Sequence, residues 1–190
     1  MNIINPEIET ERLLLRAFTP ADFEAFAAMR ADAEVMRFIG MPVGPHTREQ
    51  ARAWQERNTR RWQDNGFGMW AVVEKATGEL AGWCGLSRLD ETQEVEVGYG
   101  LARRAWGRGL ATEAARASLR YGFERMGLTR LVAVVNPANH ASRHVIEKLG
   151  LRYVKDAYHY GADLNYFEIN RAEFKPTATP YVLRETPANG

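Results

Sequence analysis

Short runs typical of strands occupy the middle of the chain, and in the last of them hydrophobic and polar residues alternate. They cover residues 69–74, 80–89 and 94–101, and turn-forming residues at 76–79 join the first two runs. Because the connections are short, the pattern predicts three neighbouring strands in an antiparallel meander. A shorter apolar run at 12–16 predicts a strand that precedes them.

Helical spacing of apolar residues predicts two helices between the first strand and the meander. Thr19 can cap the first helix, which we expect to continue with a break to Phe38, where a loop rich in Gly and Pro at 40–45 ends it. Thr47 and Gln50 have the spacing of a capping box at the start of the second helix. Both helices are therefore expected to have defined N-termini.

After the meander, the chain passes through a glycine-containing turn into a third helix. Residues 110–126 repeat small and apolar side chains every three or four positions, and Gly127 ends the pattern. The continuous apolar run at 130–135 is typical of a strand buried on both faces. Because a crossover helix joins it to the strand at 94–101, it should lie parallel to that strand.

A short helix and a hairpin complete the pattern. Apolar runs at 151–155 and 164–169 predict the two strands of the hairpin. Residues 176–190 are polar and contain proline, so we expect a loosely held tail, in which 181–183 can pack locally, after a single domain that spans 1–175. The elements together predict an α/β fold with a mixed, mostly antiparallel central sheet flanked by helices.

Composition and charge narrow the classes of function. The chain has 190 residues, 45% of them hydrophobic, and a net charge of +1, so it can bury one core and has no basic excess typical of nucleic-acid binding. It has no apolar run of membrane-spanning length and no signal-peptide pattern, so we expect a cytoplasmic protein without a membrane partner. The single cysteine, Cys84, stands in an apolar strand and is interpreted as a core residue, not a nucleophile.

Other side chains that can carry chemistry have a plain structural interpretation. We interpret Trp54 and Trp62, on one face of the second helix, as core anchors in preference to substrate contacts. His46, His140 and His144 lack the spacing of metal ligands, and we expect them at the surface. The sequence therefore predicts no metal site.

The turn between the third meander strand and the third helix has the composition of a phosphate-binding loop. Gly107 and Gly109 allow unusual torsions and a close approach of the backbone to a ligand. Amides in the first helical turn lack partners and point at an anion, while the helix dipole adds positive potential. Arg103, Arg104 and Arg108 can add charge at the rim. The turn therefore predicts a phosphorylated cofactor.

Four segments around this turn carry a family resemblance. The turn reads Arg104-Ala105-Trp106-Gly107-Arg108-Gly109, after a strand with Glu96-Val97-Gly98-Tyr99. Downstream are Asn136-Pro137-Ala138-Asn139-His140-Ala141-Ser142 and Glu147-Lys148-Leu149-Gly150-Leu151, and near the start is Thr10-Glu11-Arg12-Leu13-Leu14-Leu15-Arg16. In this order and spacing they resemble the GNAT acetyltransferases, and within them the RimJ/RimL-like branch.

The resemblance implies a fold, a donor and an acceptor. The fold has a sheet of about seven strands that splays between the fourth and fifth, leaving backbone groups that can pair with the amides of pantetheine. The donor is acetyl-CoA, and the acceptor is a primary amine that attacks directly in a ternary complex. Asn139 can bind pantetheine, cap the following helix, or do both. The expected cofactor-binding residues are Gly98, Tyr99, Leu101, Arg103, Arg104, Trp106, Gly107, Arg108, Gly109, Leu110, Ala111, Asn136, Asn139 and Ser142.

Acetylation of an amine needs a base that accepts the ammonium proton. By resemblance, Glu96 matches a frequent catalytic glutamate, although Glu94 and Glu96 share a strand face that can equally be solvent-facing. Some members of the branch carry a glutamate base in the last hairpin, and this sequence has none at 156–163. His159 or Asp163 can substitute there, so three candidates for the base stay open.

The departing thiolate needs an acid, and several hypotheses remain open here as well. Ser142 matches a serine that faces the CoA sulfur in the branch, or it is an ordinary serine in the first turn of a helix. Tyr153 is a further candidate for the acid. A non-catalytic acyl-CoA-binding module would keep the glycine turn and need neither Glu96 nor Ser142. Within the enzyme hypothesis, the acceptor is a protein N-terminal α-amine or a small amine. A homodimer is compatible with the branch.

Overall fold

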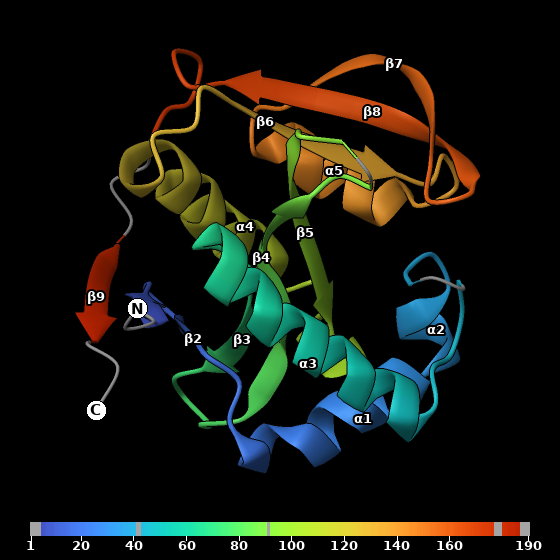
Figure 1. Cartoon of the computed structure of the whole chain (residues 1–190), viewed down its shortest axis with the longest axis vertical. Coiled ribbons are helices and arrows are strands. Elements are labelled where there is room, and N and C mark those ends of the chain that lie inside the picture. The colour runs from blue at the N-terminus through green and yellow to red at the C-terminus, as the bar shows by residue number, and fades with distance from the viewer. Residues whose placement is uncertain (1–4, 41–42, 91, 177–179, 187–190) are drawn as a thin grey trace.

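A computed structural model shows a mixed sheet with helices on both faces (Figure 1). It describes residues 5–40, 43–90, 92–176 and 180–186. In this part of the chain nine strands lie in the order β7-β8-β6-β5-β4-β3-β2-β1-β9. Their bounds are β1 Asn5–Glu9, β2 Leu13–Arg16, β3 Met69–Glu74, β4 Leu80–Arg88, β5 Val95–Leu101, β6 Arg130–Val135, β7 Arg152–His159, β8 Ala162–Asn170 and β9 Val182–Thr186.

The strand pairing confirms the predicted fold class. β3, β4 and β5 form the antiparallel meander, β5 and β6 are parallel, and β7 and β8 form the last hairpin. The expectation of about seven strands was too low, because β1 and β9 were missed. β1 contains Pro6, which is uncommon inside strands, and β9 comes from the segment expected to be a tail.

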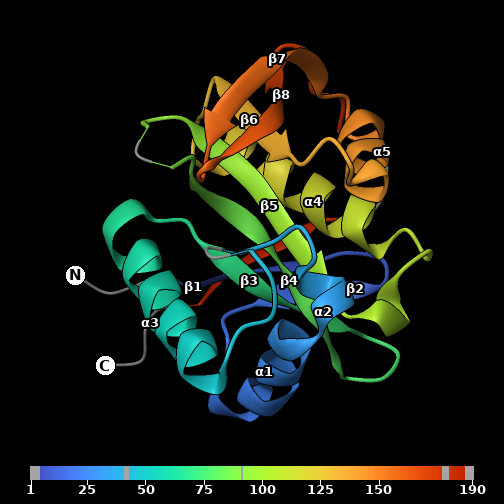
Figure 2. The ribbon, with the colours of Figure 1, turned by 90° about the vertical axis from the view of Figure 1, so that its right-hand side faces the viewer.

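Five α-helices in the described residues cover the two faces of the sheet. They are α1 Phe23–Ala31, α2 Ala33–Met36, α3 Arg48–Asn65, α4 Leu110–Arg120 and α5 His140–Lys148. Figure 2 shows α3 and α4 on opposite sides of β5. The two-residue period of β4 explains this arrangement: Cys84 and Leu86 belong to the core that includes α4, whereas Trp83 packs with Phe26 of α1.

The helix ends follow the predicted local signals. The side chains of Thr47 and Gln50 each accept from the other's backbone amide, and Gly66 takes a left-handed φ of 72° at the C-terminus of α3. The first helical segment is broken at Asp32, which caps α2. Of the loop expected at 40–45, Met41 and Pro42 lie outside the described residues.

The third helix differs from its prediction at the C-terminal end. It is α-helical only to Arg120, and a π-helical turn, Tyr121–Arg125, follows. This turn lets Tyr121 and Phe123, only two residues apart, both face the core, with 4% and 1% exposure. The Tyr121 hydroxyl donates to the carbonyl of Gly66, 2.9 Å away, which ties the turn to the end of α3.

The sheet opens between β5 and β6, as the resemblance predicted. β5 pairs with β4 along its whole length, but with β6 only at Glu96 and Val132. β6 pairs instead with β8 along its whole length, and in Figure 1 these two strands run across the upper end of β5. A glycine at Gly100 is required beside this gap, because a Cβ there would lie 2.2 Å from Trp83 Cζ2.

The C-terminal segment adds a strand at the far edge of the sheet. β9 pairs antiparallel with β1, and Arg184 forms an ion pair with Glu9 at 2.7 Å. Residues 177–179 and 187–190 of the expected tail lie outside the described residues, so the division of the chain at residue 175 stays a prediction. None of the helices in the described residues is long and apolar enough to cross a membrane.

Candidate active site

The turn between β5 and α4 presents backbone amides to its surroundings. Gly107 and Gly109 have φ values of 70° and 75°, a region that favours glycine. A Cβ on Gly107 would meet nothing within 4 Å, so the space beside it is open. Within the described chain the amides of Gly107, Arg108 and Gly109 donate no hydrogen bond. This arrangement at the N-terminus of α4 fits a phosphate or diphosphate group.

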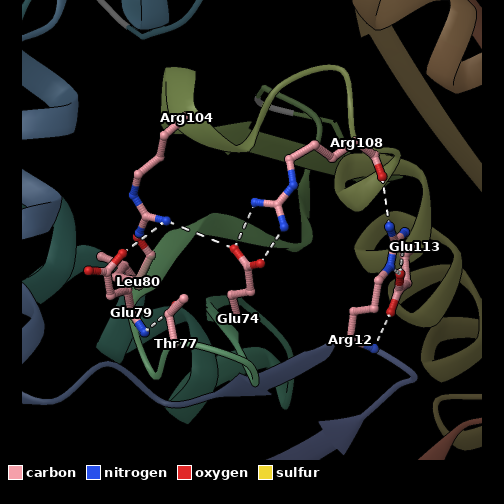
Figure 3. A network of polar contacts seen from close by, with 8 residues as sticks. All are labelled: Arg12, Glu74, Thr77, Glu79, Leu80, Arg104, Arg108 and Glu113. Carbon is pink, nitrogen blue, oxygen red and sulfur yellow. Dashed lines mark hydrogen bonds and ion pairs between the residues drawn. The ribbon is translucent and has the colours of Figure 1, made fainter.

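A network of ion pairs holds the turn in place (Figure 3). Glu74, the last residue of β3, is only 6% exposed and accepts from both terminal nitrogens of Arg108. The carbonyl of Arg108 accepts from Arg12 Nη1 at 2.8 Å, and Arg12 also pairs with Glu113 of α4 at 2.6 Å. The hydrogen bonds from Arg108 keep the pKa of Glu74 below its usual value. Both ends of Arg108 are therefore fixed, which keeps the turn preorganised.

All three arginines of the turn have acidic partners. Besides the pair of Arg108 with Glu74, Arg103 Nε lies 2.8 Å from Asp32 Oδ2, and Arg104 Nη1 lies 3.2 Å from Glu79 Oε2. The positive charge expected at the rim is therefore partly offset within the chain. The backbone amides remain the groups of the turn that are open to an anion.

The other residues predicted to bind the cofactor near the turn differ in exposure and in their contacts. Trp106 is 47% exposed, and its indole donates to the carbonyl of Leu101 at 2.7 Å. Leu110 is fully buried and Ala111 packs against the same core, so they anchor the start of α4. Beyond Glu96, on the side of β6, the backbone of β5 has no strand partner within the described chain. This edge, which includes Gly98, fits an extended ligand that carries amide groups.

Tyr99 of β5 and Ser142 of α5 meet on the face covered by α4. The Tyr99 hydroxyl lies 2.9 Å from Ser142 Oγ and 3.1 Å from the carbonyl of Ser142. Burial raises the pKa of Tyr99, so the phenol stays protonated and can act as a donor. The structure therefore brings together two residues that the sequence placed separately.

Asn136 and Asn139 shape the connection from β6 to α5. Asn139 Oδ1 accepts from the amide of Ser142 at 3.1 Å, which confirms its role as a helix cap. Asn136 Oδ1 accepts from the amide of Ala138 at 2.9 Å and so stabilises the loop. The predicted contacts of these two residues with pantetheine stay predictions.

Glu96 lies on the opposite face of β5, where the strand leaves β6. Its Oε1 accepts from the hydroxyls of Tyr160, at 2.5 Å, and Ser87, at 3.0 Å. Burial raises the pKa of Glu96 to about 7, although both hydroxyls and Arg61 oppose this shift. A carboxyl group with such a pKa can exchange a proton near neutral pH.

Glu94, two residues earlier and just before β5, has a different environment. Arg130 of β6 forms an ion pair with Glu94, and the Tyr166 hydroxyl donates to Glu94 Oε1 at 2.7 Å. Glu96 has no ion pair of this kind within the described residues. The two glutamates are therefore chemically distinct despite the two-residue repeat, and Glu96 is the better candidate for a base.

The remaining candidates lie elsewhere or are already paired. Tyr153 is 49% exposed on the outer strand β7, with its hydroxyl 3.1 Å from Asp156. His159 Nδ1 lies 3.9 Å from Asp90, and Asp163 is exposed. Neither is hydrogen-bonded to Glu96 in the described chain.

Two further predictions concern buried side chains. Cys84 is fully buried, and burial raises the pKa of its thiol to about 12, in agreement with a core role. The surface position expected for His46 was wrong: it is 7% exposed, and its Nδ1 lies 2.7 Å from Arg30. Arg30 itself lies over the rings of Trp54 and Trp83, an aromatic enclosure that no simple sequence repeat indicates.

Known proteins share this arrangement of sheet, turn and helices. The family model of the acetyltransferase (GNAT) domain matches residues 12–152. The chain belongs to the GNAT acetyltransferase family. It is 33% identical over 165 residues to the uncharacterised protein YkkB of Bacillus subtilis (strain 168), covering 85% of this chain and 94% of YkkB. The GNAT acetyltransferase from Bacillus anthracis is 32% identical, with a TM-score of 0.74 over 88% of this chain and 99% of that one.

A second relative from the same organism carries the name of an N-acetyltransferase. The uncharacterised N-acetyltransferase YoaA of Bacillus subtilis (strain 168) is 32% identical over 148 residues, covering 77% of this chain and 83% of YoaA. The chain is an N-acetyltransferase of the GNAT type, a family that uses acetyl-CoA as co-substrate. The RimJ/RimL-like branch remains a prediction.

Sequence reasoning missed the residues that surround the predicted ones. The sequence predicts Glu74 only as the end of a strand and predicts no role for Ser87, Asp90 or Tyr160. Tyr160 precedes Gly161 in a tight turn, a pattern that predicts the turn and not a contact with Glu96. The partners of Glu74, Asp90 and Tyr160 are distant in the sequence, so no local motif indicates those contacts. Ser87 and Glu96 are instead cross-strand neighbours nine positions apart, a contact that the predicted strand pairing could have indicated.

Proposed function

We propose that this GNAT enzyme transfers the acetyl group of acetyl-CoA to a primary amine by direct attack in a ternary complex, with Glu96 as the general base. The observation that carries the proposal is the environment of Glu96. Its carboxyl group is partly buried beside the β5–β6 gap and accepts hydrogen bonds from two hydroxyls. Burial raises its pKa to about 7. A base with this pKa is suited to accept a proton near neutral pH.

The donor half of the site is formed by backbone groups. The amides of Gly107, Arg108 and Gly109 and the N-terminus of α4 bind the diphosphate, while the open edge of β5 pairs with the pantetheine amides. Acetyl-CoA supplies the activated thioester. The pairing of Arg108 with Glu74 keeps the turn in the conformation that exposes these amides.

On the acceptor side, Glu96 removes the proton from the ammonium group so that the neutral amine can attack. On the opposite face, Ser142 orients its hydroxyl toward the sulfur, and Tyr99 supports that hydroxyl through the 2.9 Å contact. The raised pKa of Tyr99 keeps the phenol protonated, so Tyr99 serves as a hydrogen-bond donor to Ser142 while the Ser142 hydroxyl hydrogen-bonds the departing sulfur. The two faces of β5 thus separate deprotonation of the acceptor from stabilisation of the leaving group.

The proposal is tested by measuring thiol release from acetyl-CoA with a panel of amines. The panel contains peptides with free N-termini and small amines such as amino acids and polyamines, so that it also identifies the acceptor class. Turnover of at least one amine is expected. Tight CoA binding without turnover of any amine would overturn the proposal in favour of a non-catalytic CoA-binding module.

The role of Glu96 is tested with Glu96→Gln, and Glu94→Gln, two positions earlier and just before β5, is the matched control. With the best amine of the panel, Glu96→Gln should lower kcat/KM by at least about 100-fold, the usual contribution of a general base. CoA affinity, measured by calorimetry, should stay unchanged. Glu94→Gln should cause a far smaller loss. A wild-type rate and pH profile in Glu96→Gln would exclude Glu96 as the base.

A further inference from the structure

Asp90 and Tyr160 form a reciprocal contact between the β4–β5 loop and the β7–β8 turn. The Tyr160 amide donates to Asp90 Oδ2 and the Asp90 amide donates to the Tyr160 hydroxyl oxygen, each at 3.0 Å. These are the two residues other than glycine with positive φ in the described chain, 49° for Asp90 and 53° for Tyr160. Residues other than glycine rarely adopt this backbone conformation. Its occurrence in both partners indicates that the contact between the loop and the turn requires it.

The contact sets the direction of the Tyr160 hydroxyl. The oxygen accepts from the Asp90 amide, so its single proton is directed elsewhere. Of its two acceptors, Glu96 Oε1 lies at 2.5 Å and the carbonyl of Arg88 at 3.5 Å, so the proton is donated to Glu96. The last hairpin, which carries no glutamate, thus contributes a tyrosine that reaches the glutamate of β5.

The two oxygens of Glu96 then have different surroundings. Oε1 accepts from both Tyr160 and Ser87, whereas Oε2 has no hydrogen-bond partner within the described residues. Glu96 is only partly buried, so its side chain is not fully enclosed by the protein. One oxygen is held by the protein and the other is open to a proton donor.

We propose that Tyr160 and Asp90 are positioning residues that hold Glu96 Oε1 and thereby direct Oε2 toward the acceptor amine. This inference rests on the proposed role of Glu96 as the base. Neither residue is proposed to contact the substrate: Asp90 orients Tyr160, and Tyr160 orients Glu96. The loop and the hairpin turn therefore act together as one support for the base.

The charged groups around Glu96 determine whether a substitution raises or lowers its pKa. Arg61 of α3 favours the ionised form of Glu96 and Asp90 disfavours it, while His159 lies 3.9 Å from Asp90. Burial and the neighbouring Glu96 raise the pKa of Tyr160, so Tyr160 remains a donor across the working pH range. Because its hydrogen bond stabilises the carboxylate, removing the hydroxyl should raise the pKa of Glu96.

The test compares Tyr160→Phe with Tyr158→Phe, a matched change on the same hairpin at a side chain that is 70% exposed. The carboxyl titration of Glu96 is followed by NMR in the protein without acetyl-CoA, and kcat/KM is measured across pH with the best amine. Tyr160→Phe should shift both titrations upward by about one pH unit. Its rate should fall several-fold near pH 7 and recover at high pH, and Tyr158→Phe should match wild type.

Asp90→Ala provides a second variant that leaves the Tyr160 hydroxyl in place. It removes the carboxylate that fixes the Tyr160 amide, and it should lower kcat at pH 7 while KM for acetyl-CoA stays unchanged. A Glu96 titration in Tyr160→Phe identical to wild type would overturn the proposal, whatever the activity. A uniform loss of rate at every pH would also overturn it, because that would indicate a purely structural role.

The same data separate this inference from the proposed function. If Glu96→Gln keeps the wild-type rate, the base assignment fails, even when the NMR titration moves in Tyr160→Phe. If Glu96→Gln loses the rate and the Tyr160→Phe titration does not move, the base assignment stands and the positioning proposal fails. Each proposal therefore has its own contradicting result.

Discussion

At the scale of single residues, the site depends on two glutamates that the sequence alone cannot tell apart, Glu94 just before β5 and Glu96 within it. Glu94 is paired with Arg130, which lies 36 positions away, and Glu96 is bonded by Tyr160, which lies 64 positions away. Glu94 has a cationic partner, whereas burial disfavours the charged form of Glu96 and raises its pKa. The chemistry of each glutamate is therefore set by long-range contacts.

The raised pKa of Glu96 predicts a pH-dependent effect on stability. Between its ordinary value of 4.5 and about 7, the folded protein binds a proton at Glu96 that the unfolded chain has released. Wild type should therefore lose stability through this group as pH rises across that window. Glu96→Gln lacks the titration, so its melting temperature relative to wild type should be higher at pH 8 than at pH 5.

Thermal melts of both proteins at the two pH values check this expectation. A wild-type control at each pH removes the contribution of every other titrating group, because only the difference between the two proteins is compared. An equal difference at pH 5 and pH 8 would mean that the pKa of Glu96 is not raised in the folded protein.

At the scale of elements, the glycine turn has a conformation that its sequence motif predicts and supporting contacts that no local motif predicts. The left-handed torsions at Gly107 and Gly109 follow from the motif. The support comes from Glu74 of β3 and from Arg12, just before β2, which contact Arg108 from two other parts of the fold. The turn is thus fixed by a network spread over distant elements.

The chain offers a matched pair of glycines to test the turn. Gly107 and Gly78 have φ values of 70° and 71°, and a Cβ on either would meet nothing within 4 Å. Alanine at each position should cost a similar amount of stability, about 1 kcal/mol, because of the left-handed backbone. Only Gly107→Ala places a methyl group beside the expected diphosphate, so it should weaken CoA binding by about tenfold.

Calorimetric titration with CoA and thermal melts of both variants make the comparison. Gly78, in the β3–β4 hairpin, controls for the backbone strain alone. Equal CoA affinities in Gly107→Ala and Gly78→Ala would show that the turn does not bind the cofactor.

Local signals explain how far the elements could be predicted. The capping box at Thr47, the alternation along β5 and the apolar run of β6 are all short-range patterns, and each gave the correct element. The end of α4 could not be predicted, because the π-helical turn depends on the packing of Tyr121 and Phe123 in the core. The same reason applies to the contact of Tyr160 with Glu96.

At the scale of the whole molecule, the gap inside the sheet and the far edge of the sheet serve different purposes. The gap between β5 and β6 leaves part of β5 open for a ligand. At the far edge, β9 covers β1, and the indole of Trp70 donates to the carbonyl of Pro6 at 2.7 Å, which secures β1 against the core. The edge strand thus contributes to stability at a distance from the site, since β4, β3, β2 and β1 separate β9 from β5.

Two neighbouring residues of β9 test this separation of stability from binding. Leu183 is partly buried and packs against the main core, whereas Val182 is 46% exposed. Leu183→Ala should lower the free energy of unfolding by about 1–2 kcal/mol, and Val182→Ala should change it by less than about 0.5 kcal/mol. Chemical denaturation measures both values. CoA affinity should match wild type in both variants, because neither side chain lies near the gap. A loss of CoA affinity in Leu183→Ala under conditions where it is fully folded would show that β9 is coupled to the site. An unchanged free energy of unfolding in Leu183→Ala would show that β9 does not secure the edge of the sheet.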